Sequence, residues 1–265
     1  MNKVKKIFWG LVIVFVVLVI AAAIVAGFFL GDIIKAGMET VGPKIAQVTV
    51  KVDSVQLSLL TGAAKIQGLV VGNPEGYKTP QAISVGVVAV GVNPVSVLSD
   101  KIVVRSIEVR NPEITFEGNP LGGNNLTKIR DNVNAATASS QRPATNQTAQ
   151  AASTPGKKLE VDDFLITGAK VHVSLTGMGT NEMTLALPDI HLTDMGKDAS
   201  GITATELTRR ALDALTSATI KAVANNASDL SKGAVNLEKG AGKAATEDVN
   251  KISKSLGGLF KKSTN

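Results

Sequence analysis

The hydrophobic pattern changes its period several times along the chain, and the first segment is apolar without interruption. No charged residue falls within Ile7–Leu30, and three lysines stand directly before this run: Lys3, Lys5 and Lys6. As a helix the run would be roughly 36 Å long, which exceeds the ~30 Å hydrocarbon core of a bilayer. The sequence therefore predicts a transmembrane helix. Because positive charge stays on the cytoplasmic side, we expect the rest of the chain outside the cytoplasm.

Two alternatives exist for residues 1–30. A cleaved secretory signal would have a similar lysine-rich start, and Ala21–Ala23 would suit a cleavage site. A buried core helix is the other alternative. The apolar run continues beyond the alanines to Leu30, which is longer than the core of a signal peptide and favours an uncleaved anchor.

The next segment, Gly31–Gln47, carries apolar residues at steps of three and four, which predicts an amphipathic helix. Pro43 interrupts the pattern near its end. Such a helix could lie on the outer surface of the membrane as a collar, or it could pack on the following sheet as an ordinary first helix. The sequence leaves both interpretations open.

From Val48 the pattern changes to the alternation of apolar and polar residues that is typical of strands. Turn residues separate six such runs, at 48–52, 55–59, 63–71, 83–92, 102–109 and 114–116. Short strands at this regular spacing predict an antiparallel meander. A short helix is expected at residues 122–133, before a change in composition.

The strand at 83–92 is apolar on both faces. Strict alternation would place Val85 and Val87 on one face and Val88, Val90 and Val92 on the other. Either both faces are then covered, or one face is packed and the other is shielded from water by something other than protein. We interpret these five valines as lipid-contacting residues.

The second half of the chain begins with a polar segment. Residues 134–158 are rich in Ala, Thr, Ser, Gln and Pro and lack large apolar side chains, which predicts a disordered linker. Strand periodicity resumes over 159–200 and is expected to extend the first sheet. Residues 201–265 are expected to form amphipathic helices, with a capping box at Thr203 and Glu206.

These segments define the expected organisation. Residues 1–30 form the cytoplasmic start and anchor, 31–133 the first β region with its lead-in helix, and 134–158 the linker. Residues 159–200 form the second β segment and 201–265 the helical tail. The fold class is α+β, with an N-terminal transmembrane helix, a curved antiparallel sheet forming a short groove, and C-terminal amphipathic helices.

Composition narrows the function classes. The chain has no cysteine, so disulfides and thiolate chemistry are excluded. Aromatic residues make up only 3% of the chain, which argues against the stacking surfaces that bind nucleic acid. The net charge of +6 suits a protein held against the anionic head groups of a membrane.

Candidate chemistry is sparse. No nucleophile elbow, phosphate-binding loop or dinucleotide fingerprint occurs in the sequence. His191 follows Asp189 by two residues and so shares a strand face with it, while His172 lies between Lys170 and Ser174. These ligands are too few for zinc, which takes three or four. We therefore predict a protein that is not an enzyme and that uses neither metal nor cofactor.

Several turns and strand ends resemble those of the AsmA family of membrane-anchored envelope proteins. The matching segments are Gly-Leu-x-x-x-Asn-Pro-x-Gly-Tyr at 68–77, Ile-Val-Val-x-x-Ile at 102–107, Pro-Glu-Ile-Thr-Phe-Glu at 112–117, Asn-Asn-Leu at 124–126, and Leu-Pro-Asp-Ile-His-Leu at 187–192. The family is similar to chorein-type bridge proteins, in which a long curved sheet forms an apolar groove for lipid chains. This chain is short, so the resemblance implies a local role rather than a long bridge.

The resemblance and the anchor together imply a non-enzymatic protein of the inner membrane, with one membrane pass, its N-terminus in the cytoplasm and its bulk in the periplasm. Its sheet would contact lipid, through head groups or acyl chains, or would support assembly of the envelope and outer membrane. The alternative is a tethered scaffold whose helical tail recruits an envelope protein. In that case we expect the tail lysines to contact the partner, namely Lys251, Lys254, Lys261 and Lys262.

Overall fold

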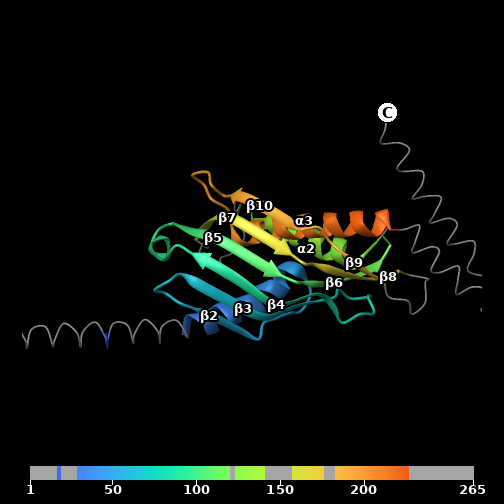
Figure 1. Cartoon of the computed structure of the whole chain (residues 1–265), viewed down its shortest axis with the longest axis horizontal. Helices are drawn as coiled ribbons and strands as arrows, with labels where there is room; N and C mark the ends of the chain where they lie inside the picture. Colours follow the sequence, from blue (N-terminus) through green and yellow to red (C-terminus); the bar gives the residue numbers. More distant parts are fainter. Residues whose placement is uncertain (1–16, 19–28, 120–122, 141–156, 176–182, 227–265) are drawn as a thin grey trace, which may run out of the picture.

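The computed structural model describes residues 17–18, 29–119, 123–140, 157–175 and 183–226 (Figure 1). Almost all of the predicted anchor, including Lys3, Lys5 and Lys6, lies outside these residues, as do most of the predicted linker and the tail from residue 227. Within the described ranges, no helix combines the length and the apolar character needed to cross a membrane.

The strands of the described residues join in one ten-stranded sheet. They are β1 (Val50–Lys51), β2 (Ser54–Leu57), β3 (Ala63–Gly72), β4 (Gln81–Val92), β5 (Lys101–Arg110), β6 (Glu113–Gly118), β7 (Lys158–Thr167), β8 (Lys170–Leu175), β9 (Met183–Ala186) and β10 (Ile190–Met195). The second β segment therefore extends the first sheet, as the periodicity predicts. A 3-10 helix, η1 (Pro94–Leu98), connects β4 to β5.

Most of these short strands are halves of longer, bent strands. β5 and β6 pair one after the other along β4, β7 and β8 pair along β5 and β6, and β10 and β9 pair along β7 and β8. The β5–β7 and β6–β8 pairs are parallel, so the expectation of a purely antiparallel sheet is wrong and the sheet is mixed. The reason lies between β6 and β7, where a helix and a long connection return the chain to the other end of the sheet.

A line of irregular positions bends the sheet across most of its width. We call it the fold line, and it consists of Gly68, Gly86, Asn111, Gly168 and Pro188. Core residues on either side of it are three positions apart instead of two: Ile66 and Leu69, Val85 and Val88, Ile166 and Ala169, Leu187 and Ile190. Two consecutive residues of each strand thus leave the core face, and the β3–β4 register stays unbroken there because the neighbouring strands bend together.

Gly168 shows why the fold line requires particular residues. Its φ is +64°, a left-handed conformation that L side chains rarely adopt. A Cβ atom built on it would lie 2.3 Å from Asn111 Oδ1 on the neighbouring strand. Glycine is therefore the residue that fits where the two bent strands approach each other.

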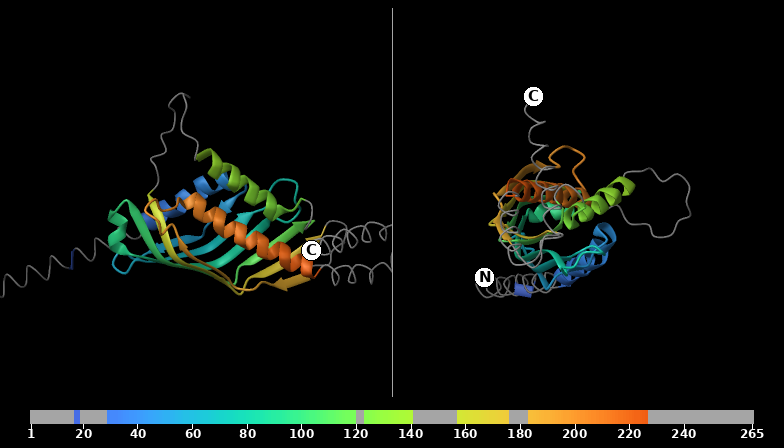
Figure 2. Two further views of the ribbon diagram at one scale, coloured as in Figure 1. Left: turned by 90° about the horizontal axis from the view of Figure 1, so that it is seen from above. Right: turned by 90° about the vertical axis from the view of Figure 1, so that its right-hand side faces the viewer.

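Three helices lie on the concave side of the bowed sheet (Figure 2). They are the first helix (residues 29–46), α2 (Asn125–Ser140) and α3 (Ala204–Asn225). The core fills the space between sheet and helices, with Ile114 and Phe116 of β6 fully buried beside Leu126 and Ile129 of α2. α2 begins near the expected start and continues beyond Val133 into the predicted linker.

The first helix packs along the edge strands β1 and β2. Glu39 Oε1 accepts a hydrogen bond from the Val52 N–H at 2.9 Å, and Lys35 Nζ donates to the Asp53 carbonyl at 2.9 Å. Near the end of the helix, Asn132 Nδ2 of α2 donates to the Ala46 carbonyl. Of the two interpretations of this helix, these contacts support the one in which it packs on the sheet.

Side-chain caps begin both later helices. Thr203 Oγ1 accepts from the Glu206 N–H at 3.1 Å, which confirms Thr203 as the N-cap of α3, while the Glu206 carboxylate binds Arg209 and Arg210. Asn124 Oδ1 accepts from the Thr127 N–H at 2.8 Å and so caps α2 in the same manner.

Candidate functional site

The inner, helix-bearing face of the sheet receives most of the valines predicted to contact lipid. Val85 and Val88 are both buried in the core, at 4% and 6% exposure, and Val90 and Val92 are half-buried against it. The expectation that Val85 and Val88 lie on opposite faces is therefore wrong. The cause is the fold line at Gly86, where two consecutive residues turn away from the core.

Val87 lies on the outer face. Its partners on the adjacent strands are Gln67 and Arg110, whereas the partners of Val88 are Ile66 and Val109. Residues opposite each other on paired strands share a face, so polar neighbours surround Val87 and apolar neighbours surround Val88. Of the five predicted valines, the structure thus brings four to the inner face.

The inner face differs from one end to the other. At the end that carries β6 and β8, Phe116, Val171 and Val173 are sealed beneath α2 and α3. Toward the other end, Ile66, Val90, Val92 and Ile102 are only half-buried. Partly accessible apolar side chains therefore occur on the inner face in the half of the sheet nearer η1, beside the buried Val104 and Val161.

A buried polar network joins three of the segments that resemble the AsmA family. Asn125, at the start of α2, donates through Nδ2 to Asn73 Oδ1 at 2.7 Å and to the Thr115 carbonyl at 2.6 Å. Its Oδ1 accepts from the Glu117 N–H at 3.0 Å. We call these residues, together with Thr79, the Asn125 network. It fastens the β3–β4 loop and α2 to β6, a role that the sequence motifs alone did not indicate.

Glu117 is the charged member of the network and is only 8% exposed. Its carboxylate accepts hydrogen bonds from the N–H groups of Lys78 and Thr79 and from Thr79 Oγ1, at 2.6 to 2.9 Å. Burial raises the pKa of Glu117, but these donors outweigh burial and bring it below its ordinary value. Burial and the nearby Glu117 charge raise the pKa of Tyr77. The arrangement suits an ionised carboxylate that orders a loop.

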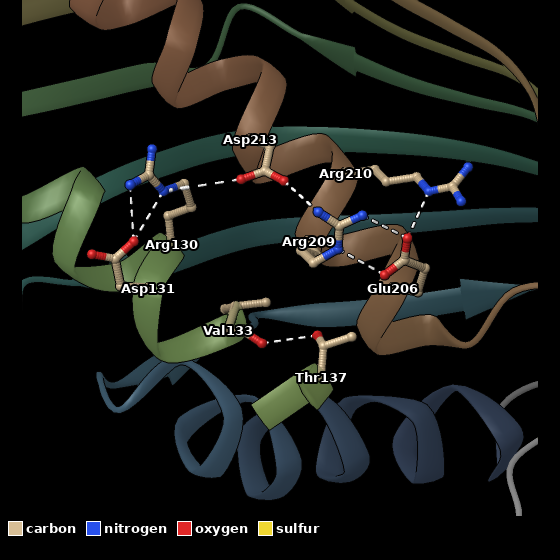
Figure 3. A network of polar contacts seen from close by, with 8 residues as sticks. All are labelled: Arg130, Asp131, Val133, Thr137, Glu206, Arg209, Arg210 and Asp213. Atoms are coloured by element: carbon tan, nitrogen blue, oxygen red, sulfur yellow. Dashed lines mark hydrogen bonds and ion pairs between the residues drawn. The ribbon is translucent and has the colours of Figure 1, made fainter. Parts of the chain in front are cut away.

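A second polar network holds the outer surfaces of α2 and α3 (Figure 3). Arg209 donates to both oxygens of Glu206 and to Asp213 Oδ2, each at 2.7 Å. Asp213 also lies 4.0 Å from Arg130 of α2. Hydrogen bonds from Arg209, against the opposing effect of burial and with help from Arg210, lower the pKa of Glu206 to about 2. This network links the side chains of α3 to one another and to α2.

The two histidines lie apart on exposed strand positions. His191 Nε2 contacts Asp163 Oδ1 on β7, while His172 Nδ1 lies 3.2 Å from Thr184 Oγ1 on β9. Within the ranges that the structure describes, no group of three His, Asp or Glu side chains is placed to hold a metal ion.

A group of exposed apolar side chains at the end of the sheet nearer η1 was not predicted from the sequence. Val95, Val97 and Leu98 of η1 are exposed, and so is Leu60 in the turn between β2 and β3. One signal was present: these apolar residues interrupt turn segments marked by Pro94 and Gly62, where polar residues are usual.

The fold and these sites define an α+β protein built on one open, bent sheet whose apolar inner face is partly closed by its own helices. The sequence profile of the AsmA family matches residues 1–254, so the chain belongs to the AsmA family. Comparisons with curated proteins and with solved structures found no match.

Proposed function

We propose that the chain is a non-enzymatic envelope protein, held at the inner membrane by a single helix at Ile7–Leu30, whose inner sheet face contacts lipid. Its N-terminus would lie in the cytoplasm and its bulk in the periplasm. Membership of the AsmA family associates the chain with the envelope. The uncharged run and the lysines before it support the orientation.

One observation carries the lipid part of the proposal. Ile66, Val90, Val92 and Ile102 form an apolar surface that the chain's own helices leave half-buried. Water contact with apolar surface costs about 25 cal/mol per Å², so covering this surface with acyl chains would be favourable. The first helix begins beside this part of the sheet, because a Cβ atom on Gly31 would lie 2.2 Å from the Val55 carbonyl oxygen and Val55 pairs with Ile66 (Figure 1). The proposed anchor therefore brings this surface close to a source of lipid.

The far half of the inner face limits this role. Phe116, Val171 and Val173 are buried under α2 and α3, so acyl chains could enter there only if the helices moved. The proposed contact is accordingly short and local. It suits an accessory protein that holds or presents a lipid, or supports envelope assembly, rather than a bridge between membranes.

A photocrosslinking experiment in cells tests the proposal. A benzophenone amino acid replaces Val92 on the inner face in one variant and Val87 on the outer face in the matched control, both in the full-length chain. We expect phospholipid adducts by mass spectrometry at position 92 and not at 87. Equal lipid labelling at both positions, or a protein adduct alone at 92, would contradict lipid contact. The second result would favour the scaffold alternative.

A further inference from the structure

The exposed apolar residues near η1 form one surface, which we call the tip: Leu60, Val95, Val97 and Leu98. Leu98 is 91% exposed, Val95 78% and Leu60 61%. Single exposed apolar residues are ordinary on protein surfaces, whereas a group of them in adjoining loops indicates a binding surface.

Close packing makes the two loops of the tip adjacent. The Val92 N–H donates to the Gly62 carbonyl at 2.7 Å, which joins the end of β4 to the β2–β3 turn. A Cβ atom on Gly62 would lie 3.0 Å from Pro94, the first residue of η1. Leu60 and the side chains of η1 therefore project from the same end of the sheet.

The first helix begins at this same end. A Cβ atom on Gly31 would lie 2.2 Å from the Val55 carbonyl oxygen in β2, the strand that leads into the Leu60 turn. Phe29 and Ile33 in the first turns of that helix are 67% and 65% exposed. The start of the first helix therefore lies beside the tip (Figures 1 and 2).

Several polar groups in and beside η1 form hydrogen bonds within the protein. Asn93 Oδ1 accepts from the Val95 N–H, and Ser96 Oγ donates to the Asn93 carbonyl and accepts from the Val103 N–H. Ser99 Oγ lies 2.7 Å from both the Ser96 and Lys101 carbonyls. A loop that enters an apolar phase must form the hydrogen bonds of its backbone within the protein. Many of these hydrogen bonds are already formed in η1 without any partner.

Basic side chains border the tip. Arg105 donates to the Val92 carbonyl, Lys157 Nζ contacts the Val97 carbonyl, and Lys101 pairs with Glu160. Asp100, Lys158 and Asp198 are further charged residues beside these cations, where the Lys158 N–H donates to the Asp100 carbonyl and Lys101 Nζ donates to the Asp198 carbonyl. Apolar side chains at the apex with lysine and arginine behind them match the order of acyl chains and phosphates in a membrane leaflet.

We propose that the tip inserts the side chains of Leu60, Val95 and Leu98 into the outer leaflet of the membrane that holds the Ile7–Leu30 segment. This inference rests on the proposed anchoring. It adds a second attachment that orients the sheet with its accessible apolar half toward the bilayer, so that lipid could pass between the leaflet and the inner face.

The absence of cysteine from the chain makes a depth measurement direct. Leu98→Cys and, separately, Val95→Cys are labelled with bimane in the full-length protein reconstituted in phospholipid vesicles. The matched control is Glu75→Cys, an exposed position in the β3–β4 loop at the opposite end of the sheet. Circular dichroism verifies the fold of each variant.

Replacing the lipids with analogues brominated in the acyl chains should quench bimane at positions 98 and 95 and leave emission at 75 unchanged. Equal emission at all three positions, in protein that still floats with the vesicles, would overturn tip insertion and leave the anchor intact. Protein that fails to float would overturn both tip insertion and the proposed anchoring. Failure of lipid contact on the inner face would instead be seen by crosslinking at Val92, with bimane quenching retained.

Discussion

Replacement of Val88 by aspartate is expected to unfold the sheet, whereas the same replacement at the adjacent Val87 should be tolerated. The two residues belong to the same strand and differ mainly in the face they occupy. Val88 is 6% exposed, between Ile66 and Val109 on the neighbouring strands. Val87 lies between Gln67 and Arg110 on the outer face.

The structure sets the size of the expected difference. Val88→Asp loses about 1.5–2 kcal/mol of apolar burial and adds several kcal/mol for an unpaired buried carboxyl group, a total of about 4–6 kcal/mol. This is a large part of the 5–15 kcal/mol that typically stabilises a domain. At Val87, the lower strand propensity of aspartate costs up to about 1 kcal/mol, and a charge opposite Arg110 offsets part of that cost.

Urea unfolding of the full-length variants in mild detergent, followed by circular dichroism, measures both free energies of unfolding. We expect Val88→Asp to be unfolded or to have a greatly lowered midpoint, and Val87→Asp to stay within about 1 kcal/mol of the parent chain. Equal losses would refute the assignment of faces, because they would mean that both sides of β4 are packed cores. The reverse order would show that the bend at Gly86 is misplaced.

Two further predictions concern the polar networks. Asn125→Ala should lower the free energy of unfolding by about 3 kcal/mol, since it leaves the Thr115 carbonyl, the Glu117 N–H and Asn73 without their partner. Thermal melts should show little change in the control Asn226→Ala. An equally small change in both variants would contradict a structural role for the network. Glu206 has a pKa near 2 in the folded chain, below its ordinary 4.5, so its stabilisation is present above pH 4.5 and is lost as the pH falls toward 2. The free energy of unfolding, measured with urea across this range, should fall by about 1–2 kcal/mol more for the parent than for Glu206→Gln, which is less than the pKa shift implies because water screens the network; parallel pH profiles would contradict this.

The local elements were predictable because each depends on nearby residues. Three local predictions correspond to elements of the structure: the strand periodicity, the helix start at Thr203 and the helical pattern of the lead-in helix. Whether two neighbouring strands pair parallel or antiparallel could not be predicted from nearby residues in the same way. Whether β7 runs parallel to β5 depends on where the chain travels between β6 and β7, and the composition of that segment does not encode its path.

The bend of the sheet has a signal in the sequence, but a strict strand period of two does not detect it. A strict period of two carries Val85 and Val87 onto one face. The core residues follow a spacing of three at Ile66 and Leu69 and again at Leu187 and Ile190, in strands far apart in sequence. The repetition of this spacing in several strands is the signal of a shared bend, since a single irregular strand would break its pairing with its neighbours.

The AsmA-like motifs illustrate another limit of reading the sequence alone. Asn73, Glu117 and Asn125 occur in three separate segments, and each reads as a turn or a strand end. Only their meeting in space shows that they form one hydrogen-bonded unit. Glu117 accepts three hydrogen bonds from the β3–β4 loop and its backbone is bound by Asn125, so the unit is complete without a ligand. The residues of the Asn125 network therefore hold the sheet and α2 together, and lipid contact must be sought outside this network.

Some residues thus hold the fold together and others remain available for lipid, and this division determines how a short sheet could bind lipid. A groove that carries acyl chains must be apolar yet open, and an apolar face left open to water destabilises the fold. In this chain α2 and α3 seal the half of the inner face around Phe116, which gives the domain its core. The other half, around Val90 and Val92, stays partly accessible beside the apolar tip. If the tip enters the leaflet, the exposed half meets acyl chains instead of water, and the membrane completes the burial that the helices leave unfinished.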